Sequence, residues 1–138
     1  MAVNAPLIDR RVMRQGAAVT ILIAVPAAVL IRLLKSSDLA GQESNWWVIG
    51  VALVLAGFVA GGYRAALGSA DLPLSHAAAG AALAFVLMVA GSAIAAAFGG
   101  THLGRAFVFL VILLALLCIS ASVLGGYAAV RRADRRRR

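Results

Sequence analysis

The sequence is poor in charged residues and has only one cysteine. Charged residues make up 13% of its 138 positions, whereas they make up about 25% of a typical soluble domain. The single cysteine, Cys118, excludes an intramolecular disulfide and a metal cluster built from cysteines. The sequence also lacks an HExxH motif, a GxSxG motif and a phosphate loop that follows a strand. It therefore predicts neither an enzyme nor a protein with a bound cofactor or metal.

Hydrophobic residues, in contrast, account for 63% of the chain. A domain this small buries only a modest fraction of its surface in water, so this much apolar surface predicts that lipid is the solvent. Four stretches resemble the apolar helix of roughly 20 residues that crosses a membrane. They cover residues 16–34, 46–63, 74–98 and 106–130. We therefore expect an all-α fold, a transmembrane four-helix bundle.

The tripeptide GGY occurs twice, at residues 61–63 and 125–127, near the ends of the second and fourth stretches. The same offset aligns GAA at 16–18 with GAA at 80–82. This pattern predicts two tandem helical hairpins, which have the same orientation because each contains two spans. The expected division of the chain is a cytoplasmic tail at 1–15, hairpins at 16–66 and 67–130, and a basic cytoplasmic tail at 131–138.

The positive charges are distributed unevenly along the chain. If both termini are cytoplasmic, ten of the thirteen Lys and Arg residues lie on the inner side, and Arg32, Lys35 and Arg105 lie outside. Cytoplasmic loops carry an excess of Lys and Arg, so this distribution predicts cytoplasmic termini. The abundance of Ala, Gly, Val and Arg is typical of a high-GC bacterial genome. We therefore expect a multi-pass protein of a bacterial plasma membrane.

Small residues recur at helical spacing in the predicted spans. Helices associate in lipid mainly through close van der Waals contact, so small residues mark their contact faces. The expected packing residues are Gly50, Gly57, Gly61, Gly80, Ala84, Gly91, Ala121 and Gly125. We expect them to point into a compact bundle, with Leu114 of the fourth span fitting the hollow at Gly50.

Aromatic and basic residues mark the expected membrane boundaries. Trp46, Trp47, Tyr63 and Tyr127 are predicted interface anchors, because Trp and Tyr gather at the level of the lipid headgroups. Anionic lipids of the inner leaflet are the expected partners of the basic tail, which attracts them electrostatically. The arginines of that tail are Arg131, Arg132, Arg135, Arg136, Arg137 and Arg138. Docking on an acidic protein is the alternative, and no nucleic acid partner is expected.

No Asp, Glu, Lys or Arg falls in the middle of a predicted span. This absence argues against a proton or ion pathway, and against the small multidrug-resistance transporters, which depend on an embedded glutamate. Ser and Thr hydroxyls in the spans are expected to bond to a carbonyl of their own helix. A polar path along Ser120 and Ser122 is the alternative. His76 and His102 lie at opposite membrane faces, so they cannot share a metal, and interfacial packing is expected for His76.

The helix ends GGYRAA and GGYAAV, the chain length and the four spans resemble the YrzE-like family of small bacterial membrane proteins. This resemblance implies four membrane helices and no particular activity or site residue. Two functions are compatible with the sequence. The first is a structural or accessory subunit, a homo-oligomer or the partner of another membrane protein, that packs through its Gly and Ala faces. The second is a minimal oligomeric transporter or channel with a path between protomers.

Overall fold

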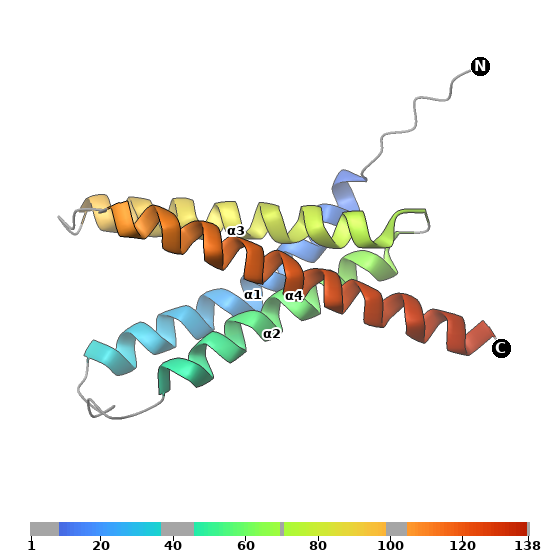
Figure 1. Cartoon of the computed structure of the whole chain (residues 1–138), viewed down its shortest axis with the longest axis horizontal. Helices are drawn as coiled ribbons and strands as arrows, with labels where there is room; N and C mark the ends of the chain where they lie inside the picture. Colours follow the sequence, from blue (N-terminus) through green and yellow to red (C-terminus); the bar gives the residue numbers. More distant parts are fainter. Residues whose placement is uncertain (1–8, 37–45, 70, 99–104, 138) are drawn as a thin grey trace, which may run out of the picture.

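The computed structural model describes residues 9–36, 46–69, 71–98 and 105–137, which form four α-helices (Figure 1). The helices are α1 (Arg10–Ser36), α2 (Trp46–Leu67), α3 (Pro73–Phe98) and α4 (Arg105–Arg137). Each contains a stretch of 20 to 26 residues that is long and apolar enough to cross a membrane. The predicted all-α bundle of four long apolar helices is confirmed.

Local sequence explains where two of the helices begin. Asp9 precedes α1, and its Oδ1 accepts a hydrogen bond of 2.8 Å from the backbone N–H of Arg11, as an N-cap residue does. α3 begins at Pro73, whose fixed φ and missing N–H suit the first position of a helix. α1 continues through Pro26, which membrane helices tolerate because neighbouring groups satisfy the freed backbone carbonyl.

The basic segment at the end of the chain is helical and continues α4. α4 contains 33 residues and ends at Arg137, which corresponds to a length of about 50 Å. The hydrocarbon core of a bilayer is only about 30 Å thick. The last turns of α4 therefore extend beyond any membrane that its apolar part crosses, and they carry arginines at fixed helical spacing.

The helices form two antiparallel hairpins, α1–α2 and α3–α4, whose chain ends lie on the same side of the molecule (Figure 1). We call this side the basic end, since the helix ends that lie there carry Arg10, Arg14, Arg64 and Arg131. α2 packs against the other three helices, whereas α1 and α4 make no contact within the described residues. If a two-fold axis related the two hairpins, it would exchange α1 with α3 and α2 with α4. The contact between α1 and α4 would then match the contact between α2 and α3. The packing of the hairpins is therefore asymmetric.

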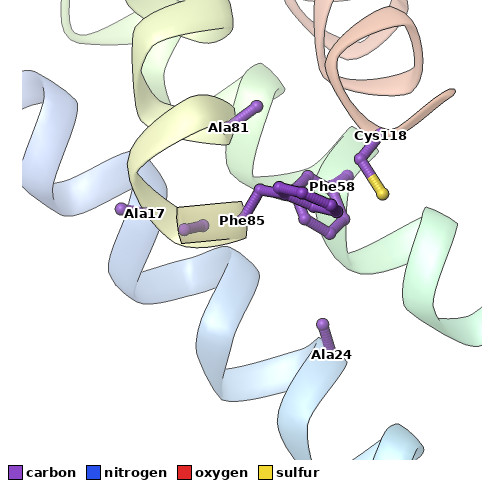
Figure 2. Close-up of a cluster of buried hydrophobic side chains, with 7 residues drawn as sticks. Ala17, Ala24, Phe58, Ala81, Phe85 and Cys118 are labelled. Carbon is purple, nitrogen blue, oxygen red and sulfur yellow. The ribbon is translucent and has the colours of Figure 1, made fainter. Parts of the chain in front are cut away.

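The core is built from small residues around two phenylalanines (Figure 2). Phe58 of α2 is completely buried and lies beside Phe85 of α3, with Cys118 of α4 nearby. Ala17 and Ala24 contribute the surface of α1. Because these alanines are short, α1 approaches α2 and α3 closely around the aromatic rings.

Large apolar side chains lie on the outside of the bundle. Leu22 is 75% exposed and Leu124 is 66% exposed, and Leu116 and Val86 are similarly uncovered. In water, an apolar surface that covers all four helices would drive association. In lipid the same surface is solvated, so the exposed leucines and the four candidate spans together support a small multi-pass membrane protein.

Candidate functional site

The contact between α1 and α2 is closed by two glycines and a threonine. A Cβ added to Gly61 would clash with the Thr20 hydroxyl and would lie 2.7 Å from the carbonyl oxygen of Gly16. The Thr20 hydroxyl donates a hydrogen bond of 3.0 Å to that same carbonyl. A Cβ on Gly16 would in turn lie 2.7 Å from Cβ of Ala65. The two backbones therefore touch, and no residue larger than glycine fits at Gly61 without a shift.

The contact between α2 and α4 depends on one glycine from each GGY copy. These are Gly62, the second glycine of the copy in α2, and Gly125, the first glycine of the copy in α4. A Cβ on Gly62 would collide with the carbonyl oxygen of Ser122, and one on Gly125 would collide with the carbonyl oxygen of Val59. A Cβ on Gly126 would lie 2.9 Å from Cβ of Ala77 on α3. Each GGY copy therefore packs against two different helices, one glycine to each.

The order of these contacts differs between the two GGY copies. In α2 the first glycine, Gly61, faces its hairpin partner α1, and Gly62 faces α4. In α4 the first glycine, Gly125, faces α2, and Gly126 faces its hairpin partner α3. The spacing of small residues predicted Gly61 and Gly125 as contact residues but did not predict Gly62 and Gly126. The repeated double glycine was the signal that pointed to them.

Most of the other expected packing residues also lie between helices. Gly57 lies against Ile23 and Ala24 of α1, and Gly80 lies against the carbonyl oxygen of Met13. Ala84 is completely buried, and Ala121 is partly buried against the core.

Two details of the packing prediction are wrong. Gly91 is exposed, and a Cβ added there would have no heavy atom within 4 Å beyond its own helix backbone, so Gly91 does not pack against the described part of the chain. The hollow at Gly50 is occupied by the side chain of Ile31 on α1, and Leu114 of α4 is 42% exposed instead. In both cases helical spacing identified small residues but could not identify the neighbouring helix.

His76 forms a polar junction at the basic end. Its Nε2 accepts a hydrogen bond of 2.7 Å from the backbone N–H of Asp9, so the ring proton is assigned to Nδ1. Nδ1 lies 2.8 Å from the carbonyl oxygen of Leu72 and 3.0 Å from the hydroxyl of Ser69. The side chain is 5% exposed. His76 therefore ties the start of α1 to the α2–α3 turn, whereas His102 lies outside the described residues.

The predicted membrane anchors are only partly described. Tyr63 is half-buried, and Tyr127 is 57% exposed. Both lie toward the basic end. Trp46 and Trp47 begin α2, but their side chains lie outside the described residues. The described tail arginines, which are all exposed, are Arg131, Arg132, Arg135 and Arg136, and the side chains of Arg137 and Arg138 are not described.

The two serines considered as a polar path point in different directions. Ser122 is buried and its hydroxyl donates a hydrogen bond of 2.8 Å to the carbonyl oxygen of Ala77 on α3. Ser120 is exposed on the outside of α4. They therefore do not line one passage, and Ser122 bonds across helices where the sequence predicted a bond within its own helix.

The described surface includes an apolar cavity and a groove beside two arginines. An apolar cavity of about 170 Å³ lies among α2, α3 and α4, next to Phe58, Phe85 and Cys118. A larger groove of about 500 Å³ lies at the basic end between α2 and α4. Tyr63 and Leu67 line it on α2, and Ala129, Arg132, Ala133 and Arg136 line it on α4. We call this second hollow the arginine groove.

The fold and these contacts define the class of multi-pass membrane protein with four candidate spans. Comparison with known proteins does not narrow the class, because no family model, no curated protein and no solved structure matches the chain.

Proposed function

We propose that this chain is a structural or accessory subunit of an assembly in a bacterial plasma membrane, with both termini in the cytoplasm. The orientation is supported by the ten basic residues that the sequence concentrates around the basic end. Kinship with the YrzE-like family stays a prediction.

The proposal rests on the hydrogen bonds that the buried polar side chains make within the chain. The only polar side chains buried among the described residues are Thr20, His76 and Ser122. Each bonds to a backbone group of the same chain. A transporter needs polar groups that a substrate can reach near the membrane centre. These three stabilise the bundle instead, which favours a structural role.

The glycine contacts indicate where a partner would bind. Gly57 and Gly61 face α1 of the same chain, so they are not available for a contact between copies. The outward leucines and valines, such as Leu22, Leu116 and Leu124, remain uncovered. A second copy or another membrane protein would therefore pack against these outward faces, and anionic lipid would meet the arginines at the basic end.

Two measurements on the full-length chain test the proposal. After gentle solubilisation of native membranes, the chain should migrate in a complex that exceeds the mass of one chain plus its detergent, with a fixed composition between preparations. Purified chain in proteoliposomes should transport neither protons nor small ions above the rate of empty vesicles. Migration as a single chain would contradict a subunit role. Flux from the chain alone that changes in Ser120→Ala or Ser122→Ala would support the transporter or channel function instead.

A further inference from the structure

The arginine groove exists because α4 stays helical beyond its apolar part. Positions 129, 132, 133 and 136 follow the three- and four-residue spacing that brings side chains to one helix face. This face of α4 lines the groove opposite Tyr63 and Leu67, which are themselves four residues apart on α2. Ala129 is buried and Ala133 is small, and Arg132 and Arg136 line the groove on the same helix face.

The groove concentrates positive charge, and no acidic residue of the described part of α4 lies on the same helix face. Arg132 and Arg136 are one turn apart, a spacing that brings Cβ atoms within about 5–6 Å and makes two like charges repel. Asp134 is two positions from each, which places it about 200° around the helix from both. An anion held between the arginines would remove their repulsion.

The donors in the groove suit a phosphate group in particular. A guanidinium presents a planar fork of N–H donors that matches phosphate oxygens, and two arginines and one tyrosine line the groove. Its volume of about 500 Å³ falls in the usual range of small-ligand sites. Free carbonyl oxygens at the end of α2 would repel an anion. Two of these carbonyls, those of Arg64 and Ala66, accept hydrogen bonds from the N–H groups of Gly68 and Ser69, so this repulsion is weakened.

The apolar part of the groove favours a phosphate that is attached to hydrocarbon. The ring of Tyr63 and the side chain of Leu67, which is 51% exposed, lie beside the two arginines. Both residues lie at the end of a candidate span that reaches Leu67, where lipid phosphates would be found. Basic pockets in this position between membrane helices bind anionic headgroups.

We propose that Tyr63, Arg132 and Arg136 form a specific binding site for the phosphate group of an anionic phospholipid. The inference rests on the proposed placement of the basic end at the inner leaflet. It goes further than a general attraction of the basic tail, since it assigns the lipid to two of the arginines and excludes their neighbours Arg131 and Arg135.

The test uses a pair of variants with equal charge. Arg132→Ala with Arg136→Ala removes the groove arginines, and Arg131→Ala with Arg135→Ala removes the same charge from the same turns of α4. Full-length protein purified in detergent is mixed with phosphatidylglycerol or with phosphatidylcholine, and native mass spectrometry counts the lipids that stay bound. Phosphatidylglycerol retention should fall on the order of tenfold in the groove variant and should remain near the wild-type level in the control. Tyr63→Phe should give a smaller loss.

Competition with inorganic phosphate identifies the source of the anion. If phosphate alone occupies the groove and displaces phosphatidylglycerol at equal concentration, the site is one for a free anion and the lipid assignment is overturned. Equal losses in the two double variants would show a charge effect without a site, and equal retention of phosphatidylcholine would show no selectivity for anionic lipid; either result overturns the proposal. All these arginines are exposed, so the variants should still fold.

The same preparations separate this inference from the proposed function. Recovery of the chain in the membrane fraction tests the membrane placement, and complex size tests the subunit role. If the Arg132→Ala and Arg136→Ala variant stays in the membrane and in its complex but binds lipid like the wild type, the lipid site in the groove is wrong and the proposed subunit role is unaffected.

Discussion

The hydroxyl of Ser122 on α4 donates a hydrogen bond of 2.8 Å to the carbonyl oxygen of Ala77 on α3. The carbonyl oxygen of Ser122 also lies against Gly62 of α2. Three helices therefore meet at one serine, which joins the two hairpins at the depth of the core.

Replacement of this serine by alanine should weaken the bundle modestly. Hydrogen bonds between membrane helices contribute about 0.6 kcal/mol on average, and measured values stay below about 2 kcal/mol. Ser122→Ala should therefore lower the free energy of unfolding by about that amount, measured by denaturant titration in mixed micelles. Ser92→Ala is the matched control, because the exposed Ser92 hydroxyl bonds to Met88 in its own helix. Equal effects of the two substitutions would contradict the importance of the interhelical bond.

Methyl groups added at the helix contacts should have a larger effect. Gly62→Ala and Gly125→Ala each place a Cβ against a backbone carbonyl of another helix, and relief of such overpacking typically costs about 1–3 kcal/mol. Gly91→Ala meets no neighbour and should be neutral or stabilising by up to about 1 kcal/mol, because alanine favours helix more than glycine does. The measurement is the unfolding free energy of each variant. A Gly91→Ala variant as unstable as Gly62→Ala would refute the described packing.

Loss of the His76 side chain should loosen the start of α1. His76→Leu removes the acceptor for the Asp9 N–H, a change worth about 1 kcal/mol. Gln can present an acceptor at a similar distance from the backbone, so His76→Gln should lose less. Hydrogen exchange in the first turn of α1 is the direct measurement, and it should be faster in His76→Leu than in His76→Gln. Ser75→Ala, at an exposed neighbouring position, should leave exchange unchanged; equal exchange in all the variants would exclude the junction.

The four helices could be predicted from the sequence because each membrane span appears in it as one long apolar run. The start of α4 was predicted within one residue, but the helix continues seven residues beyond the predicted end at residue 130. The added residues are mostly arginine, and Arg and Ala are both good helix formers. A helix that is already formed extends through them at little cost, since propagation adds one hydrogen bond for each residue fixed.

The contact partners of the glycines could not be predicted from the sequence. Gly61 and Gly91 belong to similar patterns of small residues, but Gly61 touches α1 and Gly91 is exposed. Spacing along one helix gives the face on which a residue lies, whereas its neighbour depends on the register and crossing of another helix. The arginine groove was unpredictable for the same reason, since it requires the last turns of α4 to lie beside Tyr63 and Leu67.

Cysteine labelling in intact cells shows whether the four helices cross a membrane with the basic end in the cytoplasm. Cys118→Ser provides a cysteine-free chain. Single cysteines are then introduced at Ser69 or Asp134 in one set of variants and at Gln42 or Thr101 in another. An impermeant thiol reagent should label the second set in intact cells, and should label the first set only after the cells are opened. Labelling of Ser69→Cys or Asp134→Cys from outside intact cells would exclude a cytoplasmic basic end.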